Sequence, residues 1–360
     1  MITDKYKFSK DINPKFFSTL KERVNAYFEN NQISKYGNYN MVLKAVVMLC
    51  LYFVPFVLIN AGIFTNPLLV IALWIVMGFG MAGIGLSIMH DGNHGAFSKN
   101  KLVNKITGLT ANLVGGNAKL WKLQHNVLHH TYTNIHQADE DIDGPSFLRF
   151  SPHHEKKAIH RYQHIFAFFA YGLMTLGWAG WSDHKQAIHF KNKGLIKSNN
   201  FVKEMIILTL WKLFYFAYLL VIPIFIFDLP VWLVLTGFLI MHFVCGLTLS
   251  LIFQLAHIVP MNDFPTPNEH GVIENNWAIH QLQTTANFSP KSRLFSWYIG
   301  GLNYQIEHHL FANICHIHYR KISKIVQETA REFEVPYHSQ GNFLSAIGSH
   351  YTMLKTLGRA

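Results

Sequence analysis

Charged residues are scarce in this sequence of 360 residues. They make up 14% of the chain, whereas soluble domains usually carry about 25%. Half of the residues are apolar, so a membrane protein is the first class to consider. Cysteine is also scarce, because Cys50, Cys245 and Cys315 are the only three and show no metal-binding or redox spacing. An odd, unpatterned set argues against a disulfide framework. Histidine is abundant instead, with 22 residues.

Four apolar runs are long enough to cross a bilayer, which takes about 20 residues. They cover residues 42–64, 67–89, 205–227 and 230–257. The links Thr65–Asn66 and Asp228–Leu229 are short, so the runs pair into two transmembrane helical hairpins. A shorter run, 165–181, is predicted to lie at the membrane interface or buried against the spans. The sequence therefore predicts an all-α integral membrane protein with four spans.

Lysine and arginine are distributed unevenly about these runs. Residues 1–35 carry seven, residues 90–202 carry thirteen, and the segment after residue 257 carries eight, whereas the two links carry none. Positive charge collects on the cytoplasmic side of a membrane. This pattern predicts that both termini and the middle segment are cytoplasmic. The net charge of +11 then reflects a surface beside anionic lipid and gives no reason to expect nucleic acid.

One catalytic unit is predicted, covering residues 41–335. A cytoplasmic N-terminal segment, 1–40, precedes it, and a cytoplasmic tail, 336–360, follows. Apolar residues recur at helical spacing in the N-terminal segment: Phe16, Phe17, Leu20, Val24 and Tyr27. This pattern predicts an amphipathic helix that either lies on the membrane interface or packs on the cytoplasmic domain.

Histidine is concentrated in three short clusters and at one further position. The positions are His90 and His94, then His125, His129 and His130, then His308 and His309 with Gln305 ahead of them, and finally His257 at the end of the fourth run. Residues four apart share one helix face, so each cluster can present its imidazoles toward one point, with His130 one step round. The predicted topology brings all eight histidines to one depth, just outside the hydrocarbon. Eight imidazoles suffice for two metal ions, but imidazole suits Fe, Cu, Zn and Ni alike.

The motifs H-D-G-N-H (90–94), H-N-V-L-H-H (125–130) and Q-I-E-H-H (305–309) occur in this order around the two hairpins. Together they resemble the membrane fatty acid desaturases. The leading glutamine and the run G-G-L-N-Y-Q-I-E-H-H-L-F (300–311) resemble the front-end branch, of the linoleoyl-CoA Δ6/Δ5 type. That branch inserts a double bond between an existing one and the carboxyl end. The resemblance covers nearly the whole chain, from the first span to residue 335.

The resemblance implies an oxidoreductase that uses O2 to place a cis double bond in a fatty acyl chain. It also implies a cytoplasmic helical cap that holds two iron ions. The ligands carried over from the family are His90, His94, His125, His129, His130, His257, His308 and His309. Gln305 stands where many relatives have a ninth histidine. Its amide either binds iron, directly or through a water, or orients a neighbour.

Acidic residues near the clusters are candidates for accepting hydrogen bonds from metal-bound imidazoles and fixing their orientation. They are Asp91 and Glu307 within the motifs, and Asp139 and Asp141 within the acidic run 139–143. A solvated face is the alternative for that run. Several aromatic residues near the ligands are candidates for the walls of an acyl tunnel, or else ordinary core. They are Trp121, Trp277, Phe288, Trp297 and Tyr298.

Electrons must come from outside the chain. Many front-end relatives carry a fused cytochrome b5 domain with an H-P-G-G motif, and this sequence has no such motif. The resemblance therefore implies a separate donor, such as a ferredoxin or a cytochrome b5 with its reductase, at a bacterial inner membrane. The acyl group could arrive as a CoA thioester, a carrier-protein ester or a membrane lipid.

Three other functions stay open at this stage. The first is a di-iron lipid hydroxylase or a sphingolipid-type desaturase or hydroxylase, because the ligand set does not separate these outcomes. The second is a haem-binding carrier, which would place facing histidines within the spans. The third is a metal transporter, which would place polar residues at the membrane midplane. The spans offer little of that kind beyond His242.

Overall fold

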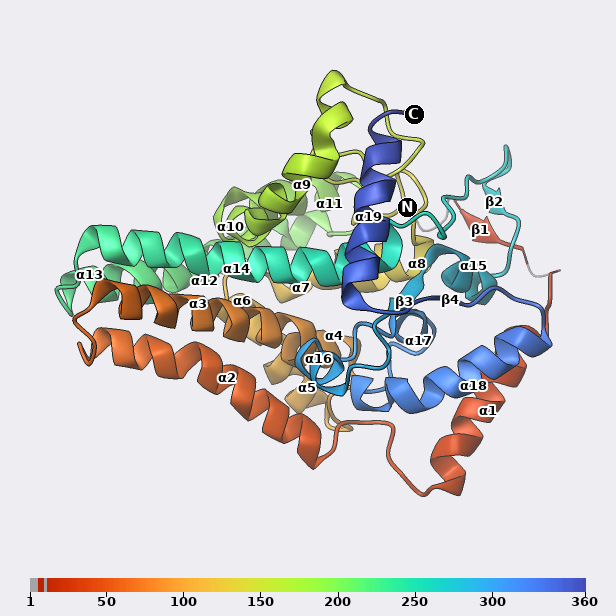
Figure 1. The fold of residues 1–360 in the computed structure, drawn as a ribbon, viewed down its shortest axis with the longest axis horizontal. Helices are drawn as coiled ribbons and strands as arrows, with labels where there is room; N and C mark the ends of the chain where they lie inside the picture. Colours follow the sequence, from red (N-terminus) through yellow and green to blue (C-terminus); the bar gives the residue numbers. More distant parts are fainter. Residues whose placement is uncertain (1–5, 10–11) are drawn as a thin grey trace.

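Two helical hairpins form the apolar half of the molecule (Figure 1). The computed structural model describes residues 6–9 and 12–360. The first hairpin consists of α2 (Tyr39–Asn60) and a helix made of α3 (Pro67–Gly83), the π-helical η2 (Ile84–Met89) and α4 (His90–His94). The second consists of α12 (Ser198–Phe216), η6 (Ala217–Val221) and α13 (Ile222–Phe225), followed by α14 (Val231–His257). In the described part of the chain these four helices are long and apolar enough to cross a membrane, in agreement with the four predicted spans.

Local capping explains where the first hairpin departs from the predicted ranges. α2 begins at Tyr39 because the Asn38 side chain accepts a hydrogen bond from a backbone N–H of the first turn, a common N-cap arrangement. The second span does not stop at residue 89. It continues through η2 and α4 and ends only before Gly95, whose φ of +72° is the left-handed conformation that closes many helices. The first histidine motif is therefore part of the span itself.

Glycines allow α3 to pack closely between α2 and α14. A Cβ atom on Gly80 would lie 2.6 Å from the backbone nitrogen of Tyr52, and one on Gly78 would lie 2.8 Å from the carbonyl oxygen of Met241. Small residues permit this approach of neighbouring backbones in membrane helices. The core of the hairpins is completed by buried side chains such as Trp74. α3 is thus held on both sides, and its continuation into α4 has a fixed position.

The middle segment folds into short helices and one bent helical pair. The short helices are α5 (Lys101–Gly108), α6 (Thr110–Leu113), α7 (Ala118–Trp121), η3 (Lys122–His129) and α8 (His130–Tyr132). The bent pair comprises η4 (Ala158–Tyr162), α9 (Gln163–Gly172), α10 (Met174–Gly177), η5 (Trp178–Ser182) and α11 (Asp183–Asn192). Its two limbs meet at 55°, so it makes a fifth span only if both are counted as one. α9 and α10 pack against α14, which agrees with burial of the run 165–181 against the spans.

The tail supplies the remaining helices. They are α15 (Trp277–Thr284), α16 (Arg293–Tyr298), α17 (Gln305–Leu310), η7 (His316–His318), α18 (Tyr319–Glu332) and α19 (Phe343–Leu357). Two small parallel sheets join distant segments. One pairs β1 (Lys7–Phe8) with β2 (Val272–Ile273), and the other pairs β3 (Ala286–Phe288) with β4 (His338–Gln340).

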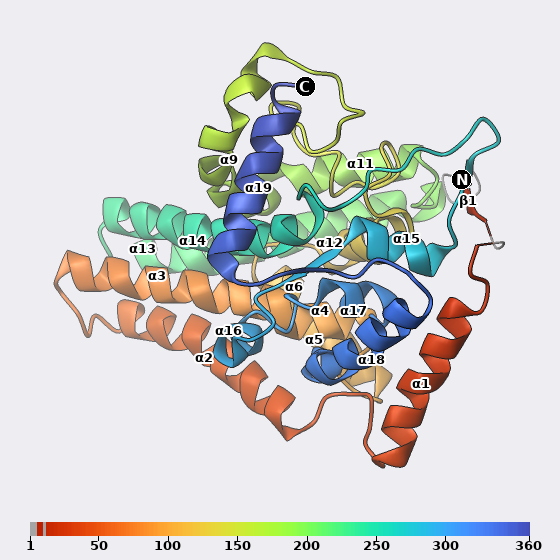
Figure 2. The same cartoon turned by 45° about the vertical axis from the view of Figure 1, so that its right-hand side comes forward.

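The amphipathic helix predicted near the N-terminus is α1 (Phe16–Asn30). Figures 1 and 2 show it lying against α18, and its residues Phe16, Leu20 and Val24 are fully buried there. Of the two arrangements expected for this helix, the structure has the one in which it packs on the globular half. Part of the predicted segment 1–40 lies outside the described residues.

The hairpins and the globular half meet where the histidine motifs lie. The turns of both hairpins are at one end of the molecule, on the left in Figures 1 and 2, far from α4 and α17. The second and fourth spans both run away from their turns and end in a histidine, His94 and His257 respectively. The fold therefore delivers these histidines to the same end of the hairpins, next to α17.

Candidate metal centre

All eight predicted histidines come together in the structure. His90 and His94 form the ends of α4, His125 and His129 lie in η3, His130 begins α8, His257 ends α14, and His308 and His309 lie in α17. The first and last of these four segments are more than 200 residues apart in the sequence, so only the tertiary fold brings them together. Each of these rings contacts at least one of the others. The centroids of His130 and His309, for example, are 4.4 Å apart.

The rings form two groups, each able to surround one ion. The first histidine group is His90, His94, His125 and His308, and the second histidine group is His129, His257 and His309. Within each group, one ring nitrogen per residue lies within 4.8 Å of the others. His130 lies between the groups: its Nε2 is 2.9 Å from Nε2 of His308 and 3.2 Å from Nε2 of His125, and its ring stacks on His309.

A π-helix accounts for the position of His130. Hydrogen bonds in a π-helix join residues five apart rather than four. Residues 122–129 adopt this conformation as η3, so His125 and His130 come to the same side of the segment. An ordinary helical period predicts His130 one step away from the other two. η2 is also π-helical and leads directly into His90. Such segments are frequent at functional sites.

Several of the inward-facing nitrogens have no hydrogen-bond partner. Nε2 of His94, His129, His257 and His309 is buried and has no partner among the residues that the structure describes. An unsatisfied buried polar atom costs about 1–3 kcal/mol, so a cluster of four is unusual unless another group satisfies them. A metal ion does so, since the neutral imidazole nitrogen is a common metal ligand. The residues present therefore fit the binding of metal ions.

The opposite nitrogens of these rings are held by outer partners. Nδ1 of His129 lies 3.0 Å from each carboxylate oxygen of Asp139. Nδ1 of His309 lies 2.8 Å from Oε1 of Gln281. Contacts of this kind fix the tautomer and ring orientation of metal-binding histidines.

The same arrangement extends to two further rings. Nδ1 of His308 is 3.2 Å from the hydroxyl oxygen of Tyr319, and Nδ1 of His257 is 3.4 Å from the carbonyl oxygen of Thr284. In each case Nδ1 faces the protein, which leaves Nε2 free to face the centre.

Burial decides the charge of the ligand rings outside the spans. Desolvation, together with the neighbouring imidazoles, holds the pKa well below the ordinary histidine value for His125, His130, His308 and His309. These rings are therefore neutral and keep a lone pair for a metal. His129 differs. Although burial alone would lower its pKa, the Asp139 carboxylate raises it above the ordinary value.

The predicted acidic partners do not all lie where the sequence suggested. Asp139 contacts His129 as described, and Oδ2 of Asp141 is 3.6 Å from Nδ1 of both His125 and His129. Burial raises the pKa of Asp141 to about 6, and Gln124 donates a hydrogen bond to it. In the acidic run these two carboxylates thus face the ligands and are buried or nearly so.

Of the two acidic residues inside the motifs, Glu307 points away from the ligand imidazoles, and Asp91 is directed mainly toward His316. Oδ2 of Asp91 is 2.9 Å from Nδ1 of His316, while its other oxygen is 3.9 Å from Nδ1 of His90. Glu307 accepts hydrogen bonds from Asn287 and Tyr337, at 2.8 and 3.0 Å, rather than from a ligand imidazole. Burial raises the pKa of Glu307 to about 7. Its helix turns it away from the centre because it lies between the inward-facing Gln305 and His308.

A large cavity of about 730 Å³ opens beside the first histidine group. His90, His125 and Gln305 line it together with apolar residues of α9, α10 and α14. Its size is typical of small-molecule sites. Gln305 is therefore next to the predicted ligands, at the position where it can touch a bound molecule or an ion.

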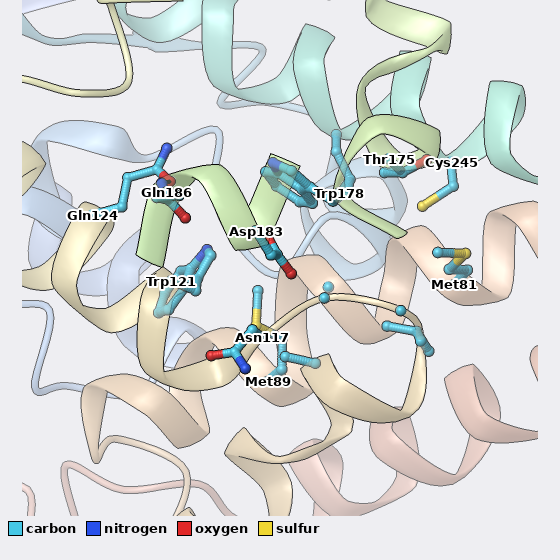
Figure 3. A pocket seen from close by; sticks show the side chains of 16 residues that line it. Met81, Met89, Asn117, Trp121, Gln124, Thr175, Trp178, Asp183, Gln186 and Cys245 are labelled. Atoms are coloured by element: carbon cyan, nitrogen blue, oxygen red, sulfur yellow. Dashed lines mark hydrogen bonds between the residues drawn. The ribbon is translucent and has the colours of Figure 1, made fainter. Parts of the chain in front are cut away.

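A small cavity of about 50 Å³ continues from the large one between the spans (Figure 3). The two share seven lining residues: Gly85, Met89, Trp121, Gln124, Trp178, Gln186 and Leu249. Figure 3 shows Gln124, Gln186 and Trp121 at one end and Met81, Thr175 and Cys245 at the other. Trp121 stacks on His125 with centroids 4.4 Å apart. The small cavity therefore leads from the histidines into the hairpins.

Of the aromatic residues predicted to wall a tunnel, Trp121 is the one that lines these cavities in the described part of the chain. Trp277 donates a hydrogen bond to the carbonyl of His130, and Tyr298 donates one to the carbonyl of Phe79. Trp297 packs against the hairpin core near Lys44, and Phe288 is core beneath α19. These four have structural contacts instead.

Comparison with known proteins agrees with this geometry. The family model described as fatty acid desaturase matches residues 65–341. The chain belongs to the fatty acid desaturase family. It is 40% identical to the sn-1 linoleoyl-lipid 6-desaturase of Arthrospira platensis, a match that covers 99% of this chain and 95% of the relative.

Other relatives of this desaturase have similar names. A Synechocystis protein, also an sn-1 linoleoyl-lipid 6-desaturase, is 35% identical, with 96% of each chain covered. An acyl-lipid (8-3)-desaturase of Physcomitrium patens is 37% identical over 96% of this chain and 72% of its own. The resemblance read from the motifs is confirmed, and with it the class of enzyme: a membrane oxidoreductase that desaturates fatty acyl chains.

Sequence reasoning missed several residues that support the desaturase centre. Gln281, Tyr319 and Gln124 hold a ligand ring or a carboxylate next to one. Gln281 and Tyr319 lie outside the three motifs, so only the fold reveals them. Gln124 directly precedes the second motif. Its polar side chain next to His125 was a sequence signal for a residue that supports the site.

Proposed function

We propose that this desaturase binds two iron ions through His90, His94, His125, His129, His130, His257, His308 and His309. The observation that carries the assignment is the pair of histidine groups with unpartnered, buried Nε2 atoms. The family is one of di-iron enzymes, which favours iron among the metals that imidazole can bind. Gln305, which lines the cavity beside His90, is proposed to contact an ion through a water or to orient a neighbour.

Once bound, the iron pair supplies the O2-dependent oxidation needed to break unactivated C–H bonds. The residues of the chain do the positioning. Asp139 and Gln281 hold the rings of His129 and His309 so that their Nε2 atoms face inward. Trp121 stacks on His125 at the junction of the two cavities and presents an apolar surface there. Orientation of this kind is a large part of catalysis when one methylene must be selected.

The proposed substrate is an acyl chain that already carries a double bond, esterified to a membrane lipid. Two relatives that cover almost the whole chain are named as linoleoyl-lipid 6-desaturases, which supports this class. In the proposed arrangement the methyl end of the acyl chain extends into the small cavity toward Met81 and Cys245. The new double bond then forms on the carboxyl side of the existing one, where the chain passes the histidines.

The proposed orientation places both termini and the metal centre in the cytoplasm. The distribution of lysine and arginine supports it, because the hairpin turns carry none. Electrons are proposed to come from a separate carrier, a ferredoxin or a cytochrome b5 with its reductase. A basic cytoplasmic surface would attract an acidic carrier.

The proposal is tested by expressing the chain in a host fed linoleate or oleate, together with a ferredoxin and its reductase. Fatty acids are profiled by gas chromatography and mass spectrometry, and iron is measured in the purified protein. We expect two iron ions per chain and a new double bond on the carboxyl side of the existing one. Replacement of His129 or His308 by Ala should abolish the product. A hydroxylated acid, or an active His308→Ala variant, would overturn the corresponding part of the proposal.

A further inference from the structure

A third group of potential metal ligands lies on the loop that follows α8, apart from the two histidine groups. His136 and Asp143 belong to this loop, and His154 lies in the turn just before η4. One ligand atom of each lies within 4.8 Å of the others. All three side chains are partly buried, with 31%, 25% and 15% of their surfaces exposed, respectively.

The distances between the ligand atoms of this group are close to those between ligands that share one metal ion. Oδ1 of Asp143 is 2.8 Å from Nε2 of His154 and 3.4 Å from Nδ1 of His136. Ligands bound at 2.0–2.1 Å in a tetrahedral site are about 3.3 Å apart. The centroids of the two imidazoles are 4.7 Å apart, which leaves their nitrogens able to converge by ring rotation. The three atoms could therefore accept an ion with small side-chain movements.

One ligand atom of the group is unsatisfied. Nδ1 of His136 is buried and has no hydrogen-bond partner within residues 6–9 and 12–360, although it lies near the Asp143 carboxylate. His154 takes the hydrogen bond to that oxygen instead. A buried nitrogen left in this state is costly. A metal ion between the three side chains would satisfy it and the carboxylate together.

The charge of the loop also favours a cation. Four of its five residues from 139 to 143 are acidic. Glu140 pairs with Lys193, and Asp139 contacts His129. Asp143 forms no ion pair with a lysine or arginine within residues 6–9 and 12–360. Its nearest polar neighbours are the ring nitrogens of His136 and His154, and a divalent ion between them would compensate the charge of the carboxylate.

We propose that His136, Asp143 and His154 form a binding site for a divalent transition-metal ion of the zinc class. Two imidazoles and one carboxylate are ligands that zinc accepts, and a fourth position is left for water. Asp143 also lines the large cavity, so the ion lies at the rim of the cavity. It ties the loop that carries Asp139 and Asp141 to the turn at His154. The site is independent of the iron assignment, because it shares no ligand with either histidine group.

The test uses the iron-loaded enzyme in detergent, dialysed against micromolar zinc and then against metal-free buffer. Zinc and iron are measured together by mass spectrometry in the wild type, in His136→Asn/His154→Asn and in His153→Asn. His153 is the matched control, since it neighbours the site but its Nε2 contacts the carbonyl of Phe264. We expect one zinc ion per chain in the wild type and in the control, at unchanged iron content. The double variant should bind zinc more weakly by over 100-fold, beyond the 10- to 100-fold that loss of an outer partner costs.

Three results would overturn the site. The first is that the double variant still takes up zinc, and the second is that the wild type takes up none. The third is that zinc enters only as iron leaves, which would place the zinc in the two histidine groups. Unchanged iron in the double variant shows that the protein is still folded. If that variant does not fold, X-ray absorption at the zinc edge of the wild type decides: two imidazoles with oxygen support the site, and three or more imidazoles contradict it.

Discussion

Both carboxylate oxygens of Asp139 lie 3.0 Å from Nδ1 of His129. The carboxylate also accepts hydrogen bonds from the backbone N–H groups of Asn134 and Asp141, at 2.9 and 3.0 Å. Asp139 is completely buried, so it is held by its neighbours and in turn holds the ring. A single acidic side chain thus links the fold of the loop after α8 to the direction in which His129 presents its free nitrogen.

Asp139→Asn should weaken iron binding without unfolding the protein. The amide keeps the size of the side chain but loses the charge, and loss of such a partner typically reduces metal affinity 10- to 100-fold. Iron retained after dialysis against a graded series of chelator concentrations measures the effect. Asp228→Asn, at an exposed hairpin turn, is the matched control. Equal retention by Asp139→Asn and wild type would contradict the orienting role.

Removal of iron should lower the thermal stability of the enzyme. Without it, four buried imidazole nitrogens stay unsatisfied. An ion held at 100 times its dissociation constant stabilises the folded state by about 2.7 kcal/mol. Scanning fluorimetry of the chelated protein in detergent should show a lower midpoint, which ferrous iron restores and magnesium does not. A midpoint indifferent to iron would count against the two histidine groups as metal sites.

Gln305→His should keep the iron and change the activity. The glutamine lines the large cavity beside His90 and His125, so an imidazole there adds a ligand without removing one. We expect unchanged iron content and a turnover number altered in either direction, both measured on the same preparation. Loss of iron would mean that the amide has a structural role at this position.

Cys245→Phe should shift the enzyme toward shorter acyl chains. Cys245 lines the small cavity at the end away from the histidines, where a larger side chain shortens the available space. One methylene that no longer fits such a pocket costs about 1–3 kcal/mol of transition-state binding. The value of kcat/KM for acyl chains of the original length should therefore fall at least tenfold. Cys50→Phe is the control, because Cys50 is exposed on α2. An unchanged chain-length profile would remove the small cavity from the acyl path.

Lys212→Met should destabilise the protein strongly. Nζ of Lys212 is 2.5 Å from Asp183 and 2.6 Å from the carbonyl of Gly115, and it also bonds the carbonyl of Trp178. Removing one partner of a buried ion pair costs about 3–5 kcal/mol, whereas replacing both with apolar residues is often neutral. Denaturation in detergent should therefore show a large loss for Lys212→Met and recovery in Lys212→Met/Asp183→Leu. Lys203→Met, at an exposed position, should have no effect.

The four apolar helices and the three histidine motifs could be found from the sequence because their signals are local. Apolar runs of sufficient length admit few structures other than membrane helices, and the motif His90–His94 follows directly from such a run. The position of His130 was not predictable in the same way. It depends on the π-helical turn of η3, and a period of 3.6 residues does not anticipate that turn.

The direction of individual side chains was the other limit. Glu307 and Asp139 are both acidic residues close to ligand histidines in sequence, yet only Asp139 contacts one. Glu307 is drawn away by Asn287 and Tyr337, which come from β3 and the segment before β4. Hydrogen-bond partners this distant in sequence cannot be predicted from a local residue pattern. The same holds for Trp277 and Tyr298, whose side chains donate hydrogen bonds to the backbone carbonyls of His130 and Phe79 and do not line the cavities.

The position of α17 has a consequence for how the enzyme is made in the cell. His308 belongs to the first histidine group and His309 to the second, so a single six-residue helix completes both. During synthesis, the ribosome must pass residue 308 before the first group can close and residue 309 before the second can, by which time both hairpins have left the exit tunnel. The metal binding that we propose for the two groups is therefore one of the last steps of biogenesis. Until then, the growing chain carries at most seven of the eight histidines that we propose as iron ligands.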